Sequence, residues 1–302
     1  MEPESGKVYL VGAGPGAADC DRVQGGSAPC ISPDSSAPTG AAVTGKVYLV
    51  GAGPGAADLL TIRAVRIIAS ADILFHDALV NREVVALAVH ARKVAVGKRH
   101  GRYSTAQAFI NKRLVDAARQ HAVVVRLKGG DPLLFGRAQE EIDALVAAGI
   151  DVEVVSGVTA ALAAGAALGV SLTQRGVSRS VTFVTPRVGK EESVSNWATA
   201  VLATDTAVIY MGAGEAQAIA DTLMARGIPG ARPVALVENA SLAGESRRVG
   251  RLSRLGQMAQ SLGSGPAIIV LGDVLLSLSA GARAAPAGGI GGEAGAAQRR
   301  QA

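Results

Sequence analysis

Short runs of Val, Ile and Leu alternate with amphipathic stretches of helical period from Gly45 onward, and this alternation constrains the fold more than any other feature. A strand followed by a helix, repeated several times, is typical of a mostly parallel sheet with helices on both faces. The predicted strands of the first half are Val47–Val50, Asp72–His76, Lys93–Val96, Val123–Leu127 and Val152–Val155. The predicted helices are Leu59–Ala69, Arg82–Ala88, Thr105–Arg119 and Arg137–Ala148.

The regular alternation of strands and helices changes after an Ala-rich helix that is predicted at Val158–Leu168. Strands are expected at 180–185, 207–210, 233–237, 247–252 and 267–271, with helices near 194–202, 215–226 and 255–262. Several of these strands are close enough in sequence for hairpins, so the second sheet should be mixed. We therefore predict an α/β protein with two lobes that meet near residue 157. The expected divisions are a disordered extension 1–44, lobes 45–157 and 158–279, and a disordered tail 280–302.

Fourteen residues, GKVYLVGAGPGAAD, occur twice, at Gly6–Asp19 and again at Gly45–Asp58. Only the second copy continues into a helical pattern and a strand, whereas the first continues into the Gly-, Ser- and Pro-rich stretch Cys20–Thr44. A short connection favours the pairing of the second copy with the strands that follow it. We expect Val47–Val50 to form the first strand and the first copy to be left over.

Composition excludes several classes of protein. The chain has 302 residues, 49% of them hydrophobic, and a formal charge of +5 without a basic stripe that contains aromatic residues, so nucleic-acid binding is not expected. The uncharged stretch Val154–Gln174 is too weakly hydrophobic for a membrane span. Both cysteines lie in the low-complexity stretch without a second ligand pair, so no metal site is predicted. A cytoplasmic protein is expected.

Three predicted strands end in glycines or acids. Gly51, Gly53 and Gly55 follow the first strand, Asp77 ends the second, and Gly129, Gly130 and Asp131 follow the fourth. Ligands of open α/β sheets bind at this carboxyl edge. The turn resembles the G-x-G-x-x-G of dinucleotide-binding proteins, but Pro54 removes a backbone N–H that a phosphate cradle needs. A purely structural tight turn, and an Asp131 that only caps the next helix, remain alternatives.

From Gly45 to about Leu278 the chain resembles the tetrapyrrole (precorrin-type) methyltransferases. The resemblance rests on VYLVGAGPG followed by LLT, ADILFHDALV, VGKR, LKGGDPLLFGR, GVTAALAAG, SLTQRG, YMG and ENA, in the order of the family. It implies two α/β lobes with S-adenosylmethionine in the cleft between them, in a homodimer. It also implies methylation of uroporphyrinogen III at C2 and C7 to give precorrin-2.

The resemblance also implies roles for individual residues. Asp77 matches the proposed proton acceptor and Lys98 the proposed proton donor, while Arg175 fits a clamp for a substrate carboxylate. The residues implied to contact the cofactor are Pro54, Gly129, Gly130, Asp131, Leu134, Thr159, Ala160, Met211 and Ala240. Because the substrate carries eight carboxylates, a rim of basic side chains is expected. The basic residues available for this rim are Lys98, Arg99, Arg102, Arg126, Lys128 and Arg175.

The residues by themselves are compatible with three other functions. A methylase of the same fold acting on a later precorrin is the nearest. An oxidoreductase that binds NAD(P) through GAGPGA, with Asp77 on the ribose, belongs to another class, as does a binding protein without catalysis.

Overall fold

A computed structural model describes residues 44–96, 107–188 and 195–279. The first copy of the repeat, the expected extension up to residue 43 and the expected tail 280–302 lie outside this range. The second copy forms the first strand, as predicted.

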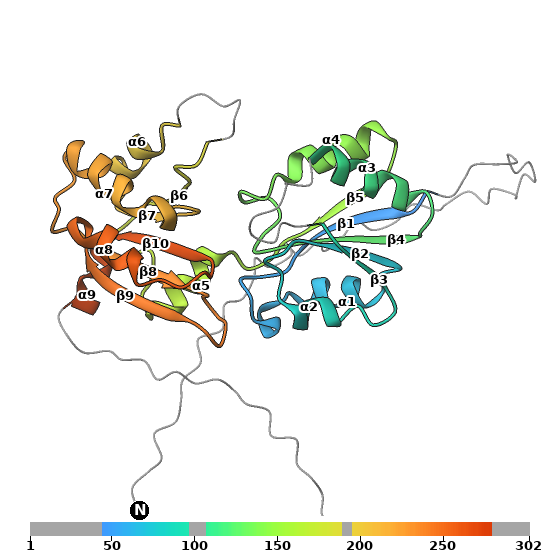
Figure 1. Cartoon of the computed structure of the whole chain (residues 1–302), viewed down its shortest axis with the longest axis horizontal. Helices are drawn as coiled ribbons and strands as arrows, with labels where there is room; N and C mark the ends of the chain where they lie inside the picture. The colour runs from blue at the N-terminus through green and yellow to red at the C-terminus, as the bar shows by residue number, and fades with distance from the viewer. Residues whose placement is uncertain (1–43, 97–106, 189–194, 280–302) are drawn as a thin grey trace, which may run out of the picture. The chain divides into compact units, whose positions relative to one another are not determined.

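The first sheet is wholly parallel, with strand order β3-β2-β4-β1-β5. Its strands are β1 (Lys46–Gly51), β2 (Ile73–His76), β3 (Arg92–Ala95), β4 (Val123–Lys128) and β5 (Val152–Val155). Its helices are α1 (Ile62–Ala69), α2 (Arg82–Ala86), α3 (Gln107–Ala118) and α4 (Ala138–Ala147). Helices α3 and α4 lie on one face of the sheet and α1 and α2 on the other (Figure 1).

Alternation along each strand divides the core of this sheet into two layers. Val47 and Leu49 of β1 pack with α3 and α4, whereas Val50 packs with α1 and α2. Because both faces are covered, the central strands contain long apolar runs, Val47–Val50 in β1 and Val123–Val125 in β4, whereas the edge strand β3 begins with the exposed Arg92 and Lys93. The same alternation sends Val124, Arg126 and Lys128 of β4 to the α3–α4 face.

The second sheet is mixed, with order β6-β7-β10-β8-β9, and only β6 and β7 are parallel. Its strands are β6 (Val181–Val184), β7 (Thr206–Ile209), β8 (Pro233–Glu238), β9 (Ser246–Arg251) and β10 (Ala267–Gly272). Its helices are α5 (Ala160–Leu168), α6 (Trp197–Leu202), α7 (Ala216–Ala225), α8 (Leu255–Gln260) and α9 (Leu276–Ser279). The predicted α/β class, with a parallel and then a mixed sheet, is confirmed.

The Ala-rich helix α5 packs on the face of the second sheet opposite to α6, α7 and α8. Small side chains such as Ala161 and Ala164 are fully buried there against Val208 and Val270. The uncharged stretch Val154–Gln174 is thus divided between a strand, a short helix and turns. Within the described part of the chain, no helix is long and apolar enough to cross a membrane.

Candidate active site

The glycine-rich loops after β1 and β4 are held together by their own backbones. Gly53 N–H donates to the carbonyl of Gly130 (3.2 Å) and Gly130 N–H donates to the carbonyl of Gly53 (2.7 Å). Both glycines have left-handed φ angles, 69° and 68°, which side chains with a Cβ rarely adopt. The pairing brings the loop that contains Pro54 against the loop that contains Gly129 and Asp131.

Asp131 ties the β4 loop to the segment that follows β5. Its Oδ1 accepts the N–H of Leu133 (2.9 Å) and its Oδ2 accepts the N–H of Gly157 (3.0 Å). The side chain therefore orders two loops, which is a wider task than capping the next helix. A carboxylate has about four acceptor positions, so Asp131 retains capacity for a ligand.

Gly129 offers open backbone at the same edge. A Cβ built on it would meet only the Cβ of Leu79, at 3.9 Å. Leu79 itself is 73% exposed and Leu133 is 61% exposed. The edge therefore combines accessible peptide groups with unburied apolar side chains, which suits a ligand that has polar and apolar parts.

Tyr210, which follows β7, holds the N-terminus of α5. Its hydroxyl oxygen accepts the N–H of Ala161 (3.0 Å) and lies 2.6 Å from the hydroxyl oxygen of Thr159. Burial raises the pKa of Tyr210, and these hydrogen bonds oppose that shift. Thr159 does not cap the helix with its own side chain. Tyr210 was not predicted as a site residue, and its local sequence signal is an aromatic residue directly after a strand.

Several other predicted cofactor residues lie on strained or closely packed loops. Met211 has a φ of 55° and is 46% exposed, directly after Tyr210. Ala240 is buried between Asn239 (φ 52°) and Ser241 (φ 70°), after β8. Such backbone angles cost free energy in residues other than glycine and cluster at functional sites.

Hydrogen bonds and packing connect these loops to the glycine loops. Ser241 Oγ accepts the N–H of Ala56 (3.1 Å). The backbone N–H of Leu134 donates to the carbonyl of Asp131 (3.3 Å). A Cβ on Gly130 would lie 3.9 Å from the Cα of Thr159, which is next to Ala160. The structure therefore brings most of the predicted cofactor residues into one neighbourhood.

Asp77 belongs to a charged group on the α3–α4 face of the first sheet. Its Oδ1 accepts from Nη2 of Arg126 (2.7 Å), and Nε of Arg126 donates to Oε1 of Glu141 (3.1 Å). Nζ of Lys128 donates to the same Oε1 (2.9 Å). We call Asp77, Arg126, Lys128 and Glu141 the buried charge cluster, although Asp77 itself retains 32% exposure.

Arg126 and Lys128 are therefore not part of an exposed basic rim, and that prediction is wrong. Their exposed fractions are 2% and 3%. Alternation along β4 points both side chains toward α4, where Glu141 is 0% exposed. Burial lowers the pKa of Lys128, the charge of Arg126 lowers it further, and Glu141 opposes both effects. Glu141 was not predicted from the sequence, where it is one of two adjacent glutamates on a helix.

The remaining predicted residues are Lys98 and Arg175, with the basic residues Arg99 and Arg102. Lys98, and with it Arg99 and Arg102, lies outside the described residues. Arg175 lies exposed on the turn that Gln174 and Ser178 close with paired backbone hydrogen bonds (2.9 and 2.8 Å). Within the part that the structure describes, no hydrogen bond or ion pair joins Arg175 to the other site residues.

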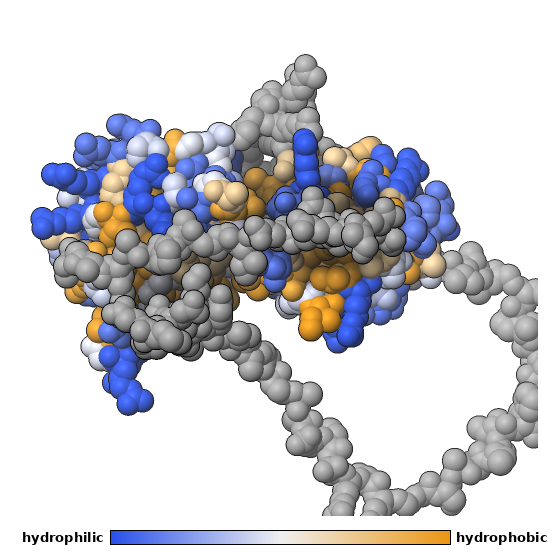
Figure 2. All heavy atoms as spheres, turned by 90° about the horizontal axis from the view of Figure 1, so that it is seen from below, coloured by the Kyte–Doolittle hydropathy of each residue, from blue (hydrophilic) through white to orange (hydrophobic). Residues whose placement is uncertain are grey.

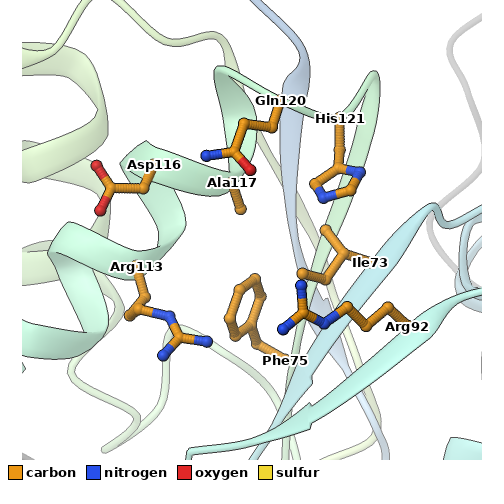
Figure 3. Close-up of a pocket in the computed structure, with 8 residues that line it drawn as sticks. All are labelled: Ile73, Phe75, Arg92, Arg113, Asp116, Ala117, Gln120 and His121. Atoms are coloured by element: carbon orange, nitrogen blue, oxygen red, sulfur yellow. The ribbon is translucent and has the colours of Figure 1, made fainter.

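A hollow of about 220 Å³ lies away from the site. Figure 3 shows Arg92, Arg113 and His121 around it, with Ile73 and Phe75 on its apolar side. Ile73 and Arg92 are the first residues of β2 and β3, so the hollow lies toward the amino ends of the strands.

Exposed apolar side chains are also not confined to the site. Figure 2 shows hydrophobic residues among hydrophilic ones on the face that it displays.

Replacing Tyr210 by Phe should lower the free energy of unfolding by about 1–2 kcal/mol, because Ala161 N–H and the Thr159 hydroxyl lose their partner. Urea denaturation followed by circular dichroism measures the change. Tyr48→Phe is the matched control, because Tyr48 makes no hydroxyl hydrogen bond within the described residues. Equal stability of the two variants would show that the Tyr210 contacts contribute nothing.

The chain is similar to known proteins in both sequence and structure. The family model of the tetrapyrrole (corrin/porphyrin) methylases matches residues 46–256. A uroporphyrinogen-III C-methyltransferase of Pseudomonas aeruginosa is 44% identical over 89% of this chain and 94% of its own length. A siroheme synthase of Zymomonas mobilis is 42% identical over 90% of this chain, which spans only 50% of that longer protein. The crystal structure of a Thermus thermophilus uroporphyrin-III C-methyltransferase with S-adenosylhomocysteine has a TM-score of 0.68 and 38% identity, and it covers 77% of this chain and 100% of that one.

Proposed function

Because this chain belongs to the tetrapyrrole methylase family, we propose that it is an enzyme that transfers methyl groups from S-adenosylmethionine to carbon atoms of uroporphyrinogen III. Methylation at C2 and C7 would give precorrin-2. The observation that carries the proposal is the 44% identity, over nearly the whole of both chains, to a uroporphyrinogen-III C-methyltransferase. The further activities of siroheme synthases are not proposed, since the chain spans only about half of their length.

The glycine loops, Thr159 and Met211 fit a cofactor with a polar and an apolar part. When bound, S-adenosylmethionine supplies a methyl group that is attached to a sulfonium sulfur. An electron-rich pyrrole carbon attacks this methyl group. We propose that the open backbone at Gly129 and Gly130, with Asp131, holds the polar part. Pro54, Leu134, Thr159, Ala160, Met211 and Ala240 would contact the rest. Fixed loops matter here because holding the two reacting groups in the correct geometry can supply a large part of the rate gain.

Asp77 is proposed as the proton acceptor. Formation of the new carbon–carbon bond leaves the ring system with a proton to lose, and a carboxylate within reach can take it. Arg126 occupies Oδ1 of Asp77 at 2.7 Å and keeps the carboxylate oriented. The side chain is 32% exposed, and Oδ2 has no hydrogen bond among the described residues.

Two further roles rest on the family resemblance. Lys98 is proposed as proton donor. Arg175 is proposed to bind a substrate carboxylate, and its exposed position on a turn, with no ion-pair partner among the described residues, leaves the guanidinium available.

The test of this function is an anaerobic assay of uroporphyrinogen III with S-adenosylmethionine, followed by product absorbance and mass. Two added methyl groups at C2 and C7 are expected. Addition to a later precorrin alone would instead identify another methylase of this fold. Calorimetric titrations with S-adenosylhomocysteine and with NADH complete the test, because binding of NADH alone would contradict the proposal.

The assembly, the location and the lobe boundary remain proposals that rest on the same resemblance. A homodimer is expected and can be measured by light scattering during size exclusion. A cytoplasmic location and the division at residues 157 and 158 are likewise proposed. The separate sheets formed by β1–β5 and β6–β10 support that division.

Deleting residues 1–44 should leave kcat and the melting temperature unchanged. The second copy supplies all of β1, which pairs with β4 and β5, and Gly45 N–H already donates to the carbonyl of Ala118 (2.7 Å). Comparison of the deleted and full-length chains in the methylation assay measures the effect. A large loss would show that the first copy has a function.

A further inference from the structure

Glu141, on the first turn of α4, binds its partners through one oxygen. Oε1 accepts from Nε of Arg126 (3.1 Å), Nζ of Lys128 (2.9 Å) and Nε2 of Gln107 (3.1 Å). Oε2 is buried and has no hydrogen-bond partner among the described residues. A carboxylate can accept hydrogen bonds at both of its oxygens. The donors instead converge on a single point.

The charges of the buried charge cluster balance. Asp77 and Glu141 carry one negative charge each, and Arg126 and Lys128 one positive charge each. Removing one partner from such a buried group leaves an uncompensated charge, which is far more costly than the group's net contribution to stability. The charge that surrounds Asp77 therefore depends on Glu141, although the two side chains are joined only through Arg126.

Arg126 is fixed on every side. Its Nε is bound by Glu141, its Nη1 donates to the carbonyl of Leu127 (3.2 Å), and its Nη2 donates to Oδ1 of Asp77 (2.7 Å). A guanidinium presents its N–H groups in a rigid planar fork, so fixing Nε determines where Nη2 points. Glu141 thus sets the direction from which Asp77 is bound.

We propose that Glu141 is a positioning residue for methyl transfer, which anchors Arg126 so that Asp77 keeps Oδ1 bound and turns Oδ2 to the substrate. Lys128 supplies the second positive charge that balances the cluster. The inference rests on the proposed function, because it assigns the cluster to the proton acceptor of that reaction. It adds a side chain of α4 to the site.

The substitution Glu141→Gln keeps the shape of the side chain and one acceptor oxygen but removes the charge. We expect kcat to fall by about 10–100-fold, since the proton acceptor is displaced and the charges are unbalanced. KM for uroporphyrinogen III and Kd for S-adenosylhomocysteine should change less than about threefold, because the glycine loops are untouched. Combining Glu141→Gln with Lys128→Met restores the balance of charge. The kcat of this double variant should be at least about tenfold higher than that of Glu141→Gln alone.

Glu140→Gln is the matched control. Glu140 is the neighbouring residue on α4, is 48% exposed at its side chain and binds Arg137 at 2.7 Å. The kcat of the Glu140→Gln variant should equal that of the unaltered chain. Calorimetry with S-adenosylhomocysteine and the melting temperature show whether each variant is folded.

The proposal is overturned if Glu141→Gln keeps kcat within about twofold, or if kcat, KM and Kd all worsen together. It is also overturned if neither the single nor the double variant folds, since Glu141 would then serve stability. Failure of the unaltered chain to methylate any tetrapyrrole would refute the proposed function itself. If the chain accepts a different tetrapyrrole, the same variants are compared with that substrate.

Discussion

Asp77→Asn should lower kcat for methylation by about 10²–10⁴-fold, the range that removal of a general base usually produces. The amide keeps the size of the side chain and an oxygen for Arg126 but cannot accept the proton. Binding of S-adenosylhomocysteine should be unchanged, because the glycine loops and Tyr210 do not contact this side chain through any described hydrogen bond. Single-turnover methylation and calorimetry measure the two quantities separately.

Asp58→Asn is the control for the charge change. Asp58 is an exposed carboxylate on the short 3-10 helix after the β1 loop, so its loss should leave kcat within about twofold. If Asp77→Asn behaved like this control, Asp77 would be only the structural partner of Arg126. The proton acceptor would then have to be sought elsewhere.

Gly51→Ala should destabilise the first lobe by about 3 kcal/mol or more, because the added methyl group has no space. A Cβ there would lie 2.6 Å from both the Cα and the N of Gly157, and 2.7 Å from the carbonyl oxygen of Gly130. These are backbone atoms of the segments that follow β5 and β4, so they cannot rotate aside as the end of a side chain could. Urea denaturation measures the loss, and S-adenosylhomocysteine binding should fall with it.

Two other glycines separate packing from binding. Gly214→Ala meets nothing within 4 Å and should change neither stability nor affinity. Gly129→Ala meets only Leu79 and should keep its stability, yet it should weaken S-adenosylhomocysteine binding by about tenfold if the cofactor binds this backbone as proposed. Equal stability of Gly51→Ala and Gly214→Ala would contradict the close approach of the loops.

Sequence periodicity predicted the elements well because it reports local burial. Strand β5 was predicted with its observed bounds, Val152–Val155, and β1 was predicted to within one residue at each end. The signal is local because strands that are covered on both faces are mostly apolar along their length. The glycine turns were equally readable, since positive φ angles and close approach favour glycine.

The candidate site likewise contains residues that a local sequence pattern predicts and residues that only distant contacts define. Gly129, Gly130 and Asp131 were singled out by their place after a strand, and Pro54 was predicted as a cofactor contact from the family resemblance. Tyr210 caps α5 by contacts to residues that lie 51 and 49 positions earlier in the chain, and its local signal, an aromatic residue directly after a strand, does not reveal these partners. Glu141 was missed for the same reason, because its partners lie on β4 and α3.

The sequence by itself determined that this is an α/β chain with a parallel and then a mixed sheet, that the second copy of the repeat forms β1, and that glycines and acidic residues follow the strands at the carboxyl edge of the first sheet. Periodicity and glycine positions suffice for that because they act over a few residues. The tertiary structure alone decided that Arg126 and Lys128 are buried partners of Asp77 and Glu141 and do not belong to an exposed rim. A basic side chain looks the same in sequence whether it meets solvent or a buried carboxylate, and only the packing of α4 against β4 separates the two.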